Sequence, residues 1–238
     1  MGSNGERAAR GGQQRAETRE VVLAAVRLFT EEGYEATTMA GIAETTGVSR
    51  RSLFRRFGSK EDVLFAEHDE LFETVVRYME ASPEPPLDTV VSAARLVFQG
   101  YVRDPEITVP RYRLVRAHDR LRDREVAMTA RYQAAFSHHL AEHAGGGRPS
   151  LEAEVVAAAL IAAHNHVLRG WLRDPEAEGI WERFDRAMGR VRAMAGPLFE
   201  GPRGGEERED RVLVAVYPSG VERAELLRRV ASAVDERG

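Results

Sequence analysis

The chain has 238 residues, 43% of them hydrophobic, which is enough for one or two domains with a substantial core. It contains no cysteine, which excludes disulfides, thiolate metal sites and a cysteine nucleophile. The formal net charge is −4, yet residues 1–60 hold ten Lys and Arg against seven Asp and Glu, so the rest of the chain carries −7. Such asymmetry is expected when only the N-terminal part of a protein contacts nucleic acid.

The N-terminal residues are polar and rich in Gly and Arg, and the chain has no run of about 18 apolar residues. We therefore expect a cytoplasmic protein that does not associate with a membrane. Residues 1–15 are expected to form a disordered basic arm, which either reaches DNA or remains a solvated tail. Helical periodicity begins near Ala16, and Gly33 ends this first helix.

Two short helices are predicted next, over Met39 to Thr46 and over Ser49 to Phe57. Thr37 and Thr38 are candidate N-caps for the first helix, and Gly47 separates the two. This spacing is typical of a helix-turn-helix, because Gly47 permits positive φ in the turn and small or apolar residues fill the space beneath the second helix.

The second short helix turns Leu53 and Phe57 inward, since they are four residues apart. Its outer face then holds arginines and a serine, which suit guanine edges and phosphates in the major groove. The alternative interpretation is that these arginines form only a solvated surface.

A capping box at Ser59 to Asp62 predicts a long helix that ends before Pro83. Further helices are expected at 87–103, 107–121, 123–144, 150–173 and 179–199, with breaks at Asp104-Pro105, Arg122-Asp123, Gly145 to Gly147 and Asp174-Pro175. No strand pattern precedes residue 200. Beyond it, we expect a linker over 201–210, a strand over 212–217 and a helix over 221–234.

Residues 17–68 resemble the DNA-binding domain of TetR-family regulators. The resemblance is carried by Phe29 to Tyr34, Thr37-Thr38, Ile42-Ala43, Gly47 to Ser49, Leu53-Phe54, Phe57 and Ser59 to Glu61. It implies an all-α fold, with a three-helix helix-turn-helix DNA-binding domain over residues 16–62 and a helical ligand-binding and dimerisation domain over 63–200. The tail over 201–238 has no assigned role.

The resemblance also implies which residues contact DNA. They are Thr38, Ser49, Arg50, Arg51, Ser52, Phe54, Arg55, Arg56 and Lys60. Phe54 stands where the family often has Tyr, so the hydroxyl that reaches a phosphate is missing, and Arg56 stands where the family often has His. Lys60, the only lysine in the chain, occupies the family's phosphate-contact position at a helix N-terminus.

Two stripes of side chains suggest a homodimer, because in TetR-like proteins the last two main helices form a four-helix bundle with those of the second subunit. One stripe is Ala157, Ala158, Ala159, Ala162 and Ala163; the other is Trp181, Phe184, Met188, Val191, Ala195 and Leu198. The alternative for either stripe is packing within one subunit. A dimer would read an inverted-repeat operator in double-stranded DNA.

The central helices of this family enclose an apolar cavity for an effector. The candidate ligand-binding residues here are Phe98, Tyr101, Arg113, Tyr132, Phe136, His164, Leu168 and Trp171. Six arginines between Arg111 and Arg124 either receive an anionic group or form a salt-bridged surface. We expect a small hydrophobic effector, with a fatty acyl compound among the candidates, and no cofactor or metal.

The expected function is therefore that of a transcriptional repressor, not an enzyme, that a ligand releases from its operator. One alternative is an activator, or a regulator controlled by a protein partner or by its own tail. A remote alternative is a zinc hydrolase, because His139, Glu142 and His143 match the H-x-x-E-H pattern of zinc peptidases. The sequence does not identify the effector, the operator or the regulated genes.

Overall fold

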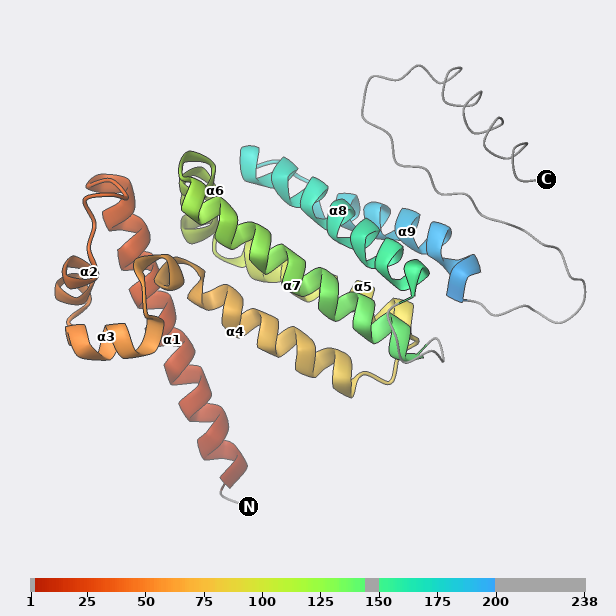
Figure 1. Cartoon of the computed structure of the whole chain (residues 1–238), viewed down its shortest axis with the longest axis horizontal. Coiled ribbons are helices and arrows are strands. Elements are labelled where there is room, and N and C mark those ends of the chain that lie inside the picture. The colour runs from red at the N-terminus through yellow and green to blue at the C-terminus, as the bar shows by residue number, and fades with distance from the viewer. Residues whose placement is uncertain (1–2, 144–149, 200–238) are drawn as a thin grey trace, which may run out of the picture. The chain divides into compact units, whose positions relative to one another are not determined.

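The computed structural model describes residues 3–143 and 150–199, and every regular element among them is an α-helix (Figure 1). The helices are α1 (Ser3–Glu31), α2 (Met39–Thr46), α3 (Arg50–Phe57), α4 (Lys60–Ala81), α5 (Pro86–Arg103), α6 (Pro105–Ala117), α7 (Asp119–His143), α8 (Leu151–Arg173) and α9 (Ile180–Phe199). The all-α expectation is confirmed. The strand and helix expected after residue 210 lie outside the described residues.

Two helix boundaries differ from the expectation. Helix α1 begins at Ser3, so residues 3–15 are helical instead of a disordered arm. Many of these residues are Ala, Arg, Gln and Glu, which have high helix propensity despite their polarity. The break expected at Arg122-Asp123 lies at His118, whose backbone N–H bonds to the carbonyl of Leu114 and ends α6.

The three N-terminal helices form a helix-turn-helix in which Thr38 is a cap that the sequence predicted, whereas Ser49 caps the next helix instead of being its first residue. Thr38 accepts a hydrogen bond from the N–H of Gly41 at 3.1 Å and starts α2. Gly47 ends α2 with φ of 67°, and Ser49 starts α3 by accepting from the N–H of Ser52 at 3.2 Å. Leu53 is fully buried beneath α3. These caps fix where α3 begins and which of its sides faces outward.

The core beneath this domain also includes residues from beyond residue 62. Leu64 and Phe65 of α4 pack in the same apolar cluster as Leu53, as do Ile107 and Val115 of α6. One contact from α1 and one from the connection between α1 and α2 reach the two ends of α6. The Arg19 guanidinium of α1 lies 2.7 Å from the Asp104 carboxylate and 2.5 Å from that of Glu106, and the Tyr34 and His118 rings are 4.5 Å apart.

Helices α5, α7, α8 and α9 surround a second apolar core. The α9 stripe that was expected to form the dimer interface lies in this core, since Phe184, Met188, Val191 and Ala195 are all buried within one chain. Phe98 of α5 is fully buried against the Phe184 ring, at 4.7 Å between centroids. This stripe therefore packs within the subunit, because the apolar side of α9 faces α5 and α8.

Helix α8 is, among the described residues, the one helix long and apolar enough to cross a membrane. Its apolar side packs against α7 and α9, as the core helix of a helical domain requires. Of its alanine stripe, Ala157 is buried whereas Ala162 is exposed.

Candidate functional site

Helix α3 presents an exposed basic surface, as its sequence predicts. Arg50, Arg51 and Arg55 are exposed, and Phe54 remains 43% exposed although it is aromatic. The Arg50 guanidinium lies 5.7 Å from the centre of the Phe54 ring. Nothing in the described part of the chain pairs with the Arg51 guanidinium. A set of uncompensated guanidinium groups on one short, capped helix is suited to phosphates and guanine edges.

The hydroxyl residues proposed for DNA contact act first as caps. Thr38 and Ser49 are exposed at the N-termini of α2 and α3. The Ser49 hydroxyl also donates to the Ser52 hydroxyl at 2.9 Å. Their positions place backbone N–H groups of two helix N-termini at the surface, where anions are favoured.

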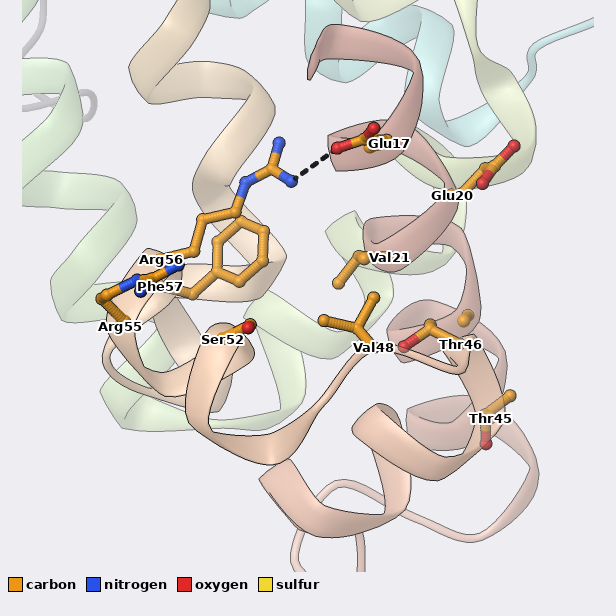
Figure 2. Close-up of a pocket in the computed structure, with 11 residues that line it drawn as sticks. Glu17, Glu20, Val21, Thr45, Thr46, Val48, Ser52, Arg55, Arg56 and Phe57 are labelled. Carbon is orange, nitrogen blue, oxygen red and sulfur yellow. Dashed lines mark ion pairs between the residues drawn. The ribbon is translucent and has the colours of Figure 1, made fainter. Parts of the chain in front are cut away.

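Arg56 turns away from this surface toward α1. Its guanidinium donates to the Thr18 hydroxyl and lies 3.6 Å from the Glu17 carboxylate. Figure 2 shows this ion pair across a groove of about 650 Å³ between α1, the end of α2 and α3. Arg56 therefore fixes α3 against α1, and the DNA contact expected of it remains a prediction. The pairing partner is 39 residues earlier in the chain, so no local pattern indicated it.

Lys60 is similarly engaged inside the domain. Its Nζ donates to the backbone carbonyls of Tyr34 at 2.6 Å and Thr37 at 3.2 Å, and lies 4.1 Å from the centre of the Tyr34 ring. The Tyr34 hydroxyl donates in turn to the Glu61 carboxylate. The ammonium thus stabilises the turn between α1 and α2. A phosphate contact remains a prediction for its third N–H.

The ligand-binding candidates fall into four groups, and three of these groups line no hollow large enough for an organic ligand. Phe98 and Trp171 are packed in the core and line none of the described hollows. Tyr132, Phe136 and His164 surround a void of about 20 Å³, which holds no more than a water molecule. Arg113 is exposed and away from these hollows.

Tyr101 and Leu168 are the two candidates that line a hollow large enough for an organic ligand. This hollow, of about 390 Å³, lies between α4, α5, α6, α7 and α8. We call it the α6–α8 hollow. Burial raises the pKa of Tyr101 to about 12, so its phenol stays protonated at neutral pH.

The α6–α8 hollow is lined by a buried cation, Arg111. It is the first arginine of the run that was expected either to receive an anionic group or to form a salt-bridged surface, and it was not among the candidate ligand-binding residues. Arg111 is 4% exposed, and its Nη2 lies 3.2 Å from Nε2 of His68, which is also 4% exposed. Burial, together with the charge of Arg111, holds the pKa of His68 well below its ordinary value. His68 is therefore neutral and accepts from the guanidinium at Nε2, which leaves its proton on Nδ1.

Both members of this pair keep an unsatisfied donor. Within the described residues, Nη1 of Arg111 and Nδ1 of His68 are buried and have no hydrogen-bond partner. Arg111 and His68 also line a second hollow of about 480 Å³ between α1, α4 and α5, so they stand between two hollows. Buried donors without acceptors are costly, which makes this pair the most unusual polar feature of the domain.

Other arginines of the run from Arg111 to Arg124 are paired or solvent-facing. Arg124 lies 3.3 Å from the Asp62 carboxylate and 3.0 Å from that of Asp69, and Arg122 pairs with Asp119. For these two residues the interpretation as a salt-bridged surface is confirmed. The two bridges of Arg124 also attach α7 to α4.

The H-x-x-E-H residues do not assemble into a zinc site. Nδ1 of His143 lies 2.8 Å from the backbone carbonyl of His139, and the Glu142 carboxylate lies 3.2 Å from the neighbouring His138. Across residues 3–143 and 150–199, no three His, Asp or Glu side chains are grouped so as to hold a metal ion. The pattern arises from histidines on the last turns of α7.

The chain matches two family models. Residues 21–66 match the model of bacterial regulatory proteins of the tetR family, and residues 84–195 match the MftR C-terminal domain.

Curated relatives match over shorter stretches. The regulator TcmR of Streptomyces glaucescens is 36% identical over 115 residues, which is 48% of this chain and 50% of TcmR. The transcriptional repressor AcnR of Corynebacterium glutamicum is 34% identical over 87 residues, 37% of this chain and 41% of AcnR. The chain thus spans half or less of these relatives.

A solved structure from Syntrophomonas wolfei, described as a TetR-family transcriptional regulator, covers 77% of this chain and 96% of its own. Its TM-score is 0.60 at 14% identity, which supports the fold.

Proposed function

Because the chain belongs to the TetR family of bacterial regulatory proteins, we propose that it is a cytoplasmic DNA-binding regulator that represses transcription and is released by a small ligand. The observation that carries this proposal is the exposed, uncompensated arginine face of α3 on a capped helix-turn-helix. Two relatives support it, because TcmR is a transcriptional regulator and AcnR is a transcriptional repressor.

The proposal includes a homodimer, since one helix-turn-helix reads too few base pairs to find a unique operator. The buried α9 stripe is unavailable, so the interface must use other residues of α8 and α9. Exposed small residues support this choice: Ala162 on α8, and Gly189 and Ala193 on α9, let helices approach closely. Met194, which is 63% exposed, adds apolar area.

Ligand release follows from the attachments of α4. This helix starts at the end of the helix-turn-helix, lines the α6–α8 hollow with Phe65 and His68, and is tied to α7 through Arg124. A ligand that binds more tightly to one position of α4 would favour the state with that position. The two DNA-binding domains of the dimer would then change their distance from each other.

To test DNA binding, operator fragments are selected from random duplexes with the full chain, and their affinity is measured by mobility shift. Arg51→Ala should weaken binding to the selected duplex by about 1–3 kcal/mol and make the protein less selective among DNA sequences. Arg113→Ala removes the same charge from exposed α6 and should leave sequence preference unchanged. Selection of no duplex, or equal effects of both variants, would refute the proposed reading surface.

The proposed homodimer is tested by analytical ultracentrifugation. Ala162→Arg should yield a folded monomer that binds the selected duplex poorly. Ala127→Arg places the same side chain at an exposed position of α7 and should remain dimeric. A dimeric Ala162→Arg variant would place the interface elsewhere.

A further inference from the structure

The Arg111–His68 pair presents donors and no acceptor. Arg111 keeps Nη1 free within the described residues, and the neutral His68 keeps its Nδ1–H free. A carboxylate accepts only, and it can take one hydrogen bond at each oxygen. An acceptor-only anion satisfies both orphan donors and also offsets the buried charge of Arg111, which a neutral acceptor such as water would leave uncompensated.

The surrounding charges select an anion with one negative charge. Glu125 lines the same hollow and Glu67 lines the neighbouring one, but neither carboxylate comes within ion-pair distance of Arg111. Burial raises the pKa of Glu67 despite the nearby positive charge of Arg111. The α6–α8 hollow itself is lined by two guanidinium groups, Arg111 and Arg169, and one carboxyl group, Glu125, so its formal excess of one positive charge offsets a monoanion, whereas a phosphate dianion would exceed it.

Part of the hollow suits an apolar body, whereas Thr108, Thr129, Gln133 and Asn165 line it with polar groups. Next to Arg111 it is lined by Phe65, Tyr101, Val115, Leu168 and Leu172. Its volume of about 390 Å³ is at the small end of ligand pockets. The space accommodates an aromatic ring system or a short chain.

We propose that Arg111 and His68 bind the carboxylate of a small apolar acid whose hydrophobic body fills the α6–α8 hollow. This inference rests on the proposed function, because it names the chemical class of the effector. It also gives the effector a path to DNA. His68 lies on α4 three residues after Phe65, and Phe65 belongs to the core beneath the reading helix.

The test uses three acids, benzoate, 2-naphthoate and octanoate, each beside its uncharged primary alcohol. Binding to the full chain is measured by isothermal titration calorimetry without DNA. At least one acid should bind about tenfold or more tightly than its alcohol, because hydrogen bonds to charged partners are stronger than neutral ones. If no acid is preferred to its alcohol, the proposal is wrong.

Variants locate the preference. Arg111→Gln should abolish it, whereas Arg113→Gln, which removes an exposed arginine of the same helix, should keep it. Glu125→Gln should strengthen acid binding, because it removes a negative charge from the hollow. Retention of the full preference by Arg111→Gln would overturn the proposal. Should circular dichroism show that this variant does not fold, Arg111→Lys, which keeps the charge but loses the forked donors, should weaken the preference.

The two proposals fail separately. A chain that prefers acids through Arg111 but selects no duplex would refute the regulator and keep the carboxylate site. A chain that selects an operator but shows no acid preference would refute the carboxylate site alone.

Discussion

Replacing Lys60 by methionine should destabilise the helix-turn-helix, because the Lys60 ammonium makes most of its contacts inside the domain and few with solvent. Methionine keeps a long apolar stem and removes the ammonium. Two backbone carbonyls, of Tyr34 and Thr37, then lose their donor, and the contact with the Tyr34 ring is lost. Hydrogen bonds to charged groups contribute roughly 1.5–3 kcal/mol, and a half-buried site lies toward the lower end. We expect the free energy of unfolding to fall by about 1–2 kcal/mol.

The assay is urea unfolding followed by far-UV circular dichroism. Arg55→Met is the matched control, since it removes a cation with a long stem from an exposed position that has no partner within the described residues. Its free energy of unfolding should stay within about 0.5 kcal/mol of wild type. If Lys60→Met is as stable as Arg55→Met, the inference that Lys60 stabilises the turn between α1 and α2 is wrong.

Three further results are expected from the same unfolding assay. Leu53→Ala, at a fully buried site, should cost about 2–5 kcal/mol and abolish operator binding; a loss under 1 kcal/mol would contradict the packing beneath α3. Ser59→Ala should cost about 1 kcal/mol, because Ser59 caps α4 by accepting from the N–H of Asp62 at 3.0 Å; Ser92→Ala, inside α5, is its control, because the Ser92 side chain has no hydrogen-bond partner among the described residues. Burial lowers the pKa of His164 to about 4, so as the pH falls from 6.5 to 4 the unfolded chain takes up a proton that the folded chain does not, and this residue lowers stability by roughly 3 kcal/mol. His164→Phe should make this part of the pH profile less steep without flattening it, because burial also lowers the pKa of His68; an unchanged profile would show that His164 is not buried in the neutral form.

Helix ends that depend on local chemistry were predictable from the sequence. Gly47 and the threonine and serine caps act through residues within four positions, so their pattern indicates the outcome. Helix α6 ends at His118 without a Gly or Pro that would indicate a break in the sequence. At this end the His118 ring packs on Tyr34, which is a tertiary contact. The sequence pattern also could not tell which apolar surface the α9 stripe would face.

The candidate site divides in the same way. The outward side of α3 follows from helical periodicity once Leu53 is assigned to the core. The partners of Arg56, Lys60 and Arg111 lie 23 to 43 residues away in the chain, and their roles depend on the tertiary fold. Long-range ion pairs and buried donors leave no periodic pattern in a sequence.

The shared core beneath the reading helix has a consequence for dissecting the protein. A fragment that stops at residue 62 keeps all three helices of the helix-turn-helix but lacks Leu64, Phe65, Ile107 and Val115, which complete its interior. Such a fragment would expose this apolar surface to water and lose the ion pair between Arg19 and Asp104 at the start of α6. The recognition module is therefore not autonomous, and gene fusions or truncations should retain the chain through at least Leu121 of α7, which belongs to the same core.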